Sequence, residues 1–86
     1  MKVYIPSPLR SYTKKENCVD GEGASLKEIL GNLDKSYPGI KFRMIDEQGG
    51  IREHIKLFVN EEEARSLTVN VSPADVVHII CALSGG

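Results

Sequence analysis

The sequence predicts an α+β domain in which one main helix lies across one face of a mixed sheet of four to five strands. Three observations support this fold class. One amphipathic helical stripe follows Ser25, short β-prone segments flank it, and the most apolar segment, 76–83, comes last. The 86 residues suffice for one core but not for two. We therefore expect a single domain over residues 1–83, followed by a flexible tail at 84–86.

The helix is the best-defined element of the prediction. Ser25 and Glu28 have the spacing of a capping box, in which each side chain satisfies a backbone donor near the helix start. Pro38 and Gly39 end the helix. Gly31 weakens it by roughly 1 kcal/mol relative to alanine, so the helix must pack against a sheet to be stable. Its apolar stripe consists of Leu26, Ile29, Leu30, Leu33 and Tyr37.

The strands are predicted from β-prone runs, period-two alternation and the turns between them. Pro6 and Pro8 stop the first strand, Gly49 and Gly50 form a turn, and a further turn follows Val59. The segment 9–13 is either a turn or a continued strand, and 40–45 is ambiguous between a loop and a helical turn. The predicted strands cover residues 2–5, 16–20, 55–59, a short stretch within 64–71, and 76–83.

The last strand is predicted to be central, because it is apolar on both faces except at His78. Two early strands, a crossing helix and a late central strand describe a β-grasp, the architecture of ubiquitin, with the last strand parallel to the first. We expect the helix to pack on a face lined by Val3, Ile5, Leu57, Val59, Val77 and Ile79. The opposite face is predicted to bind a partner protein through Phe58, Val76, His78, Ile80 and Ala82.

Composition excludes several classes of function. With 11 basic and 12 acidic residues the net charge is −1, which argues against nucleic acid as the partner. Segment 76–83 is too short to span a membrane, and no signal peptide is visible. Cys18 and Cys81 form no disulfide framework, so a cytoplasmic location is expected. We expect no bond between these cysteines, because the first strand separates their strands.

Catalytic and cofactor motifs are missing from the sequence. No phosphate-binding loop or nucleophile elbow occurs, and the glycines at 21 and 23 are a bare G-x-G turn. The two histidines, His54 and His78, and the two cysteines form no recognisable metal-site motif. We therefore expect no metal, no bound cofactor and no enzyme activity of the chain itself.

The C-terminal residues suggest a reaction in which this chain is a co-substrate. Gly85 and Gly86 follow Leu83 and Ser84. Glycine lacks a Cβ, so such a tail can enter another protein's active site and present an unhindered carboxylate. ATP-dependent adenylation of the Gly86 carboxylate would provide a leaving group that sulfur can displace. The resulting thiocarboxylate would be a nucleophile, as a cysteine thiolate is.

The chain resembles the ubiquitin-like sulfur carrier proteins, a family that includes the molybdopterin synthase small subunit, the thiamin sulfur carrier and the CysO-type carriers of cysteine synthesis. The resemblance is closest to the CysO type and covers nearly the whole chain. It rests on Ile5-Pro6 with Leu9-Arg10 and Thr13, on Leu33, Tyr37 and Gly39-Ile40, on residues 57–63 with Arg65, on Asp75-Val76, and on Ser84-Gly85-Gly86.

The resemblance implies partners for this chain. An E1-like adenylyltransferase would consume ATP to activate Gly86, and a sulfur donor would convert Gly86 to the thiocarboxylate. A pyridoxal-phosphate cysteine or homocysteine synthase would accept the sulfur, and a JAMM-type metalloprotease would release the new amino acid. Three alternatives remain open at this point: a molybdopterin synthase small subunit that serves the large subunit, a ubiquitin-like modifier joined to lysines through Gly86, and a stand-alone binding module or small enzyme.

Overall fold

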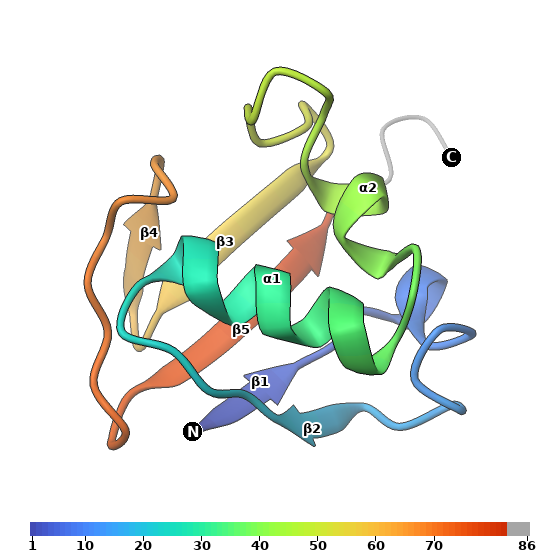
Figure 1. The fold of residues 1–86 in the computed structure, drawn as a ribbon, viewed down its shortest axis with the longest axis horizontal. Helices are drawn as coiled ribbons and strands as arrows, with labels where there is room; N and C mark the ends of the chain where they lie inside the picture. The colour runs from blue at the N-terminus through green and yellow to red at the C-terminus, as the bar shows by residue number, and fades with distance from the viewer. Residues whose placement is uncertain (83–86) are drawn as a thin grey trace.

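The computed structural model describes residues 1–82, which form the predicted α+β architecture with one long helix across a five-stranded sheet (Figure 1). The elements are β1 (Lys2–Tyr4), the 3-10 helix η1 (Ser7–Leu9), β2 (Cys18–Asp20), α1 (Leu26–Ser36), α2 (Ile40–Met44), β3 (Ile55–Val59), β4 (Glu62–Ala64) and β5 (Val76–Cys81). Within residues 1–82, no helix has the length and apolar content needed to cross a bilayer.

The sheet has the order β2-β1-β5-β3-β4, so β5 is the central strand as predicted. It runs parallel to β1, where Val77 pairs with Val3, and antiparallel to β3, where Ile79 pairs with Leu57. These four residues are fully or almost fully buried, because they lie on the face that α1 covers. The β-grasp topology and the parallel pairing of first and last strands are therefore confirmed.

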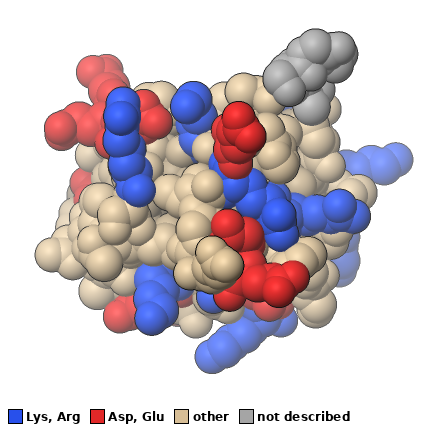
Figure 2. Space-filling model, turned by 90° about the horizontal axis from the view of Figure 1, so that it is seen from above, with Lys and Arg blue, Asp and Glu red and all other residues tan. Residues whose placement is uncertain are grey.

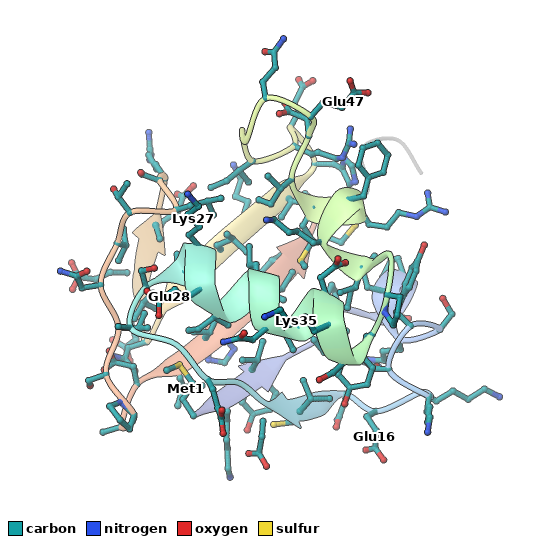
Figure 3. All side chains as sticks on the ribbon, in the orientation of Figure 1. Met1, Glu16, Lys27, Glu28, Lys35 and Glu47 are labelled. Atoms are coloured by element: carbon teal, nitrogen blue, oxygen red, sulfur yellow. The ribbon has the colours of Figure 1, made fainter. Side chains whose placement is uncertain are left out.

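Helix α1 begins and packs as its sequence pattern predicts. The Ser25 hydroxyl oxygen accepts a hydrogen bond from the Glu28 N–H at 3.3 Å, and the Glu28 carboxylate accepts one from the Ala24 N–H at 3.1 Å. Lys27, Glu28 and Lys35 lie on the solvent side of α1 (Figure 3). The buried side of α1 joins the core through Leu26, Ile29, Leu30 and Leu33, which meet sheet residues including Val3, Ile5, Leu57, Val77 and Ile79, with Val59 half-buried at the margin.

The predicted strand within 64–71 is wrong in its position. β4 lies earlier, at Glu62–Ala64, and the following residues are irregular. Their alternating apolar residues pack beside the start of α1: the carbonyls of Leu67 and Val69 accept hydrogen bonds at 3.0 and 3.1 Å from the first two N–H groups of α1. A helix start has unpaired N–H groups, and this segment satisfies two of them instead of pairing in the sheet.

Two segments that the sequence left ambiguous are helical or turn-like. Residues 40–45 contain α2, which buries Ile40 and Met44 against the core. After η1, residues 9–13 continue as turns closed by Thr13, whose buried hydroxyl donates to the Glu16 carbonyl at 2.8 Å. The second strand is shorter than the predicted 16–20 and begins at Cys18.

Substitution Gly31→Ala is expected to stabilise the fold by about 0.5–1 kcal/mol. A Cβ at this position of α1 would meet no atom within 4 Å, so the gain in helix propensity carries no packing penalty. Urea unfolding of the two proteins measures the difference. An unchanged or lower free energy of unfolding would contradict this account of α1.

Candidate functional site: the open sheet face and the end of β5

The face of the sheet opposite α1, called here the open face, carries a row of aromatic side chains. Tyr4 pairs with His78 across β1 and β5, and His78 pairs with Phe58 across β5 and β3. The Tyr4 and His78 rings are stacked, with centroids 5.0 Å apart and an interplanar angle of 7°. Because the core face of these strands is filled by α1, this row is the part of the sheet that a second protein can reach.

The predicted partner-binding residues fall on or beside this face. Val76, His78 and Ile80 alternate along β5 with the buried residues, and Ile80 remains 44% exposed. Opposite Ile80 stands Lys56 of β3, so the aromatic and aliphatic row has a charged border. Ala82 follows the end of β5 and is exposed. Their shared placement is as predicted, while their role in partner binding remains a prediction.

Tyr4 belongs to the open face but was missed by the sequence analysis. It is 37% exposed and lies between the buried residues Val3 and Ile5. That alternation was visible in the sequence, since residues flanking an inward position of a strand point outward. The sequence analysis treated the first strand only as a contributor to the core, and its outward side chain was therefore left out.

The end of β5 lies beside a shallow groove of about 360 Å³. It lies where β1 has ended and the chain turns into η1, next to the last residues of β5. The Ala82 N–H donates to the His54 carbonyl at 2.7 Å, which fixes the last described residue of the chain to the loop before β3. The groove is lined by Tyr4, Ile5, Pro6, Ser7, Pro8, Arg10, Asn17, Ile79, Ile80 and Cys81.

The predicted tail residues Leu83, Ser84, Gly85 and Gly86 lie outside the described residues. The last described residue, Ala82, lies at the end of the central strand beside the groove. Here β5 pairs with β3 alone, through Cys81 and Ile55, because β1 ends opposite His78.

A polar network holds the other end of β5. The Asn60 side chain accepts the Val76 N–H at 3.0 Å and donates to Asp75 at 3.1 Å, and Asp75 accepts the Ser72 N–H at 2.9 Å. The Ser72 N–H, and then the Asn60 amide, lower the pKa of the Asp75 carboxyl. Asn60 adopts a positive φ of 58° at the turn between β3 and β4. This network fixes the first residue of β5, and with it the register of the strand whose outward residues form part of the open face.

The two cysteines lie on opposite faces of the sheet. Cys18 pairs with Tyr4 on the open face, whereas Cys81 is packed partly against the core. β1 lies between their strands, which confirms the predicted order, and both are free thiols. Among residues 1–82, no group of three His, Cys, Asp or Glu side chains is placed to hold a metal ion.

Comparison with known proteins identifies the family. The ThiS family matches residues 3–86, a range that includes the open-face strands and the Gly-Gly end. The chain belongs to the ThiS family. Within it, the chain is 30% identical to sulfur carrier protein CysO of Mycobacterium tuberculosis (strain CDC 1551 / Oshkosh), over 98% of this chain and 96% of the relative. CysO of Mycobacterium bovis is similar to the same extent.

Several solved structures share the fold of this chain. The CysO chain in the Amycolatopsis orientalis BexX/CysO complex superposes with a TM-score of 0.92 at 33% identity, covering 99% of this chain and 98% of that one. Mycobacterium tuberculosis CysO gives 0.91 at 29% identity, over 95% and 98% of the two chains. SAMP1 from Haloferax volcanii, at 24% identity and a TM-score of 0.79 over 100% and 98% of the two chains, shares the fold alone.

Proposed function

We propose that this ThiS-family protein carries sulfur as a thiocarboxylate on Gly86 and donates it to the biosynthesis of cysteine or homocysteine. The observation that supports this best is the family match through residue 86, together with near-complete coverage of the sulfur carrier protein CysO. The identity of 30–33% to two CysO proteins favours the amino-acid pathway over transfer of sulfur to a pterin.

The proposed chemistry needs only the C-terminal carboxylate of this chain. An adenylating enzyme joins the Gly86 carboxylate to AMP and releases pyrophosphate from ATP. Sulfide from a donor attacks the activated carbonyl carbon, AMP leaves, and one carboxylate oxygen is thereby replaced by sulfur. The ionised sulfur then acts as the nucleophile, as a thiolate does, and forms a bond to the side-chain carbon of an activated serine or homoserine, while the activated oxygen substituent leaves that carbon.

In this proposal all catalytic groups belong to the partners, and the chain is a protein co-substrate. The expected partners are an E1-like adenylyltransferase, a pyridoxal-phosphate-dependent synthase and a JAMM-type metalloprotease that frees the amino acid from the carrier. A relative supports the expectation of a partner protein of some kind, since the Amycolatopsis CysO has been solved in complex with a second protein, BexX. The open face and the end of β5 are the proposed contact surface for the adenylyltransferase.

Mass spectrometry of the intact protein from its native cell tests the proposed function. We expect a population in which one oxygen of the C-terminus is replaced by sulfur, and a further population with a cysteine or homocysteine adduct at Gly86. The same sulfur-for-oxygen mass change should appear in vitro with the cognate adenylyltransferase, ATP and sulfide. A chain found only with an unmodified carboxylate, or only in isopeptide bonds to lysines, would contradict the proposal.

Substitution Ile80→Glu is expected to weaken binding to the adenylyltransferase by about tenfold or more, because a charge would be buried in the contact. The fold should persist, since Ile80 is 44% exposed and Lys56 stands directly opposite to pair with the new carboxylate. Isothermal titration measures the affinity. Thr68→Glu adds the same charge at an exposed position outside the open face and should leave affinity unchanged. Equal affinities for both variants would remove the open face from the contact.

A further inference from the structure

Three arginines around the end of β5, Arg10, Arg43 and Arg52, are fixed in the same manner; they are called here the arginine rim. Within residues 1–82, each donates a hydrogen bond only from its Nε–H, and the terminal nitrogens of the guanidinium fork have no partner among these residues. A fork held in this way loses less side-chain entropy when it binds an anion. The acceptors are the Ile5 carbonyl at 2.9 Å, the Tyr12 hydroxyl at 2.7 Å and the Phe42 carbonyl at 2.7 Å, respectively.

Aromatic rings support two of these arginines. The Arg52 guanidinium carbon lies 4.6 Å from the centroid of the Phe42 ring, and that of Arg43 lies 5.9 Å from the centroid of Tyr12. Phe42 itself is 55% exposed, more than the exposed tyrosine and isoleucine of the open face. Phe42, Arg43 and Arg52 line a groove of about 230 Å³ together with His54. An exposed aromatic residue beside oriented cations is a composition typical of protein interfaces.

Within residues 1–82 the nearby acidic residues form no ion pair with the rim, although Asp46 and Glu47 line a hollow together with Arg52. Asp34 accepts two backbone N–H groups of the 39–41 turn, and Asp46 accepts two of the 48–50 turn. Glu47 stands at the tip of the loop after α2 (Figure 3). In the part of the chain that the structure describes, both ion pairs involve Glu63, and neither includes an arginine of the rim. Figure 2 shows Lys and Arg side chains gathered across this end of the molecule, with acidic ones interspersed.

The rim and the open face both lie near the end of β5. His54, which lines the Phe42 groove, accepts the Ala82 N–H through its carbonyl, and Arg10 lines the groove beside Ile80 and Cys81. Any protein that takes the residues after Ala82 into its active site must therefore approach this end of the sheet. An apolar contact on the open face alone would leave the rim charges facing that protein.

We propose that the arginine rim binds an acidic segment of the adenylyltransferase, as a second contact beside the open face that strengthens docking of the carrier. The proposal rests on the proposed function, because it assigns a further surface to the same partner. Charge complementarity identifies the occupant as acidic. A nucleic acid fits less well, since the chain as a whole has a net charge of −1 and repels a long polyanion.

The test is the KM for the carrier in ATP-dependent sulfur loading, measured with the double variant Arg43→Gln plus Arg52→Gln at low and high salt. We expect a KM about fivefold higher at low salt, with kcat unchanged, because the charges act on encounter and binding and not on the reacting carboxylate. At high salt the two proteins should converge, since exposed charge pairs are screened.

Two further variants separate charge from structure. Arg43→Lys plus Arg52→Lys loses the same Nε hydrogen bonds but keeps both charges, and its KM should fall between those of the unchanged protein and the glutamine variant. Lys27→Gln plus Lys35→Gln on the solvent side of α1 removes the same net charge and should leave KM unchanged. Equal KM values for the glutamine variant and the unchanged protein would overturn the proposal, as would an equal loss in the lysine variant. The unchanged protein is loaded with sulfur alongside every variant. Failure of the proposed function would appear as no loading of the unchanged protein, whereas failure of the rim proposal would appear as equal KM values.

Discussion

Deletion of Gly86 is expected to abolish sulfur loading and to leave the unfolding temperature unchanged. The shortened chain still ends in a carboxylate, now on Gly85, but this group falls roughly 3.5 Å short of the reacting position. A displacement of 1 Å alone can cost about a hundredfold in rate. Stability should not change, because the described core is formed within residues 1–82 and a terminal glycine has no side chain to bury. Intact mass after incubation with adenylyltransferase, ATP and sulfide measures the loading.

Two controls make the deletion specific. A full-length chain with a C-terminal amide on Gly86 keeps the tail length but lacks the carboxylate, and it should load no sulfur. Gly85→Ala keeps both length and carboxylate, and it should load more slowly if its Cβ meets the wall of the partner's channel. If the chain without Gly86 loads as fast as the full chain, the carrier role assigned to Gly86 is refuted.

Most of the fold follows from patterns that are local in the sequence. The capping box at Ser25 and the stripe that ends at Leu33 predict α1, because both depend on residues three or four positions apart. The uniform apolar character of β5 predicts a central strand, and with one crossing helix this leaves the β-grasp topology as the solution. Local patterning and global topology agree here, which is the condition for a well-specified fold.

The features that the sequence did not predict depend on contacts distant in the chain. Leu67 and Val69 alternate like strand residues, yet their carbonyls bond to the start of α1, some forty residues earlier. The arginine rim is similarly hidden, since Arg43 finds its hydroxyl partner on Tyr12, 31 residues away. No spacing rule relates such positions, so only the folded structure shows them.

The candidate site likewise has one part that the sequence predicted and one part that it did not. The alternation in β5 predicted which residues face away from α1, and His78 and Ile80 do so. Their function depends on a partner, and nothing in a strand's own pattern specifies what binds it. The Gly-Gly end predicts a reaction, because glycine gives an unhindered C-terminal carboxylate. It carries no information about packing, so the surface that contacts the partner is inferred from the folded sheet.

Substitution Leu30→Ala is expected to lower the free energy of unfolding by about 2–5 kcal/mol. Leu30 is fully buried at the centre of α1, where it joins the core shared with β1, β3 and β5. Shortening it to alanine removes apolar contacts and leaves a cavity that the packed sheet beneath can fill only in part. Small domains have total stabilities of roughly 5–15 kcal/mol, so this single change removes a large share.

The neighbouring residues of α1 provide matched controls for this loss. Lys35→Ala shortens an exposed side chain of the same helix and should change stability by no more than about 0.5 kcal/mol. Because alanine favours helix more than leucine does, helix propensity cannot account for a large loss at Leu30. Urea unfolding of the variants compares them directly. A loss at Leu30 below about 0.5 kcal/mol would mean that α1 does not hold the sheet, and that the open face owes its shape to something other than this core.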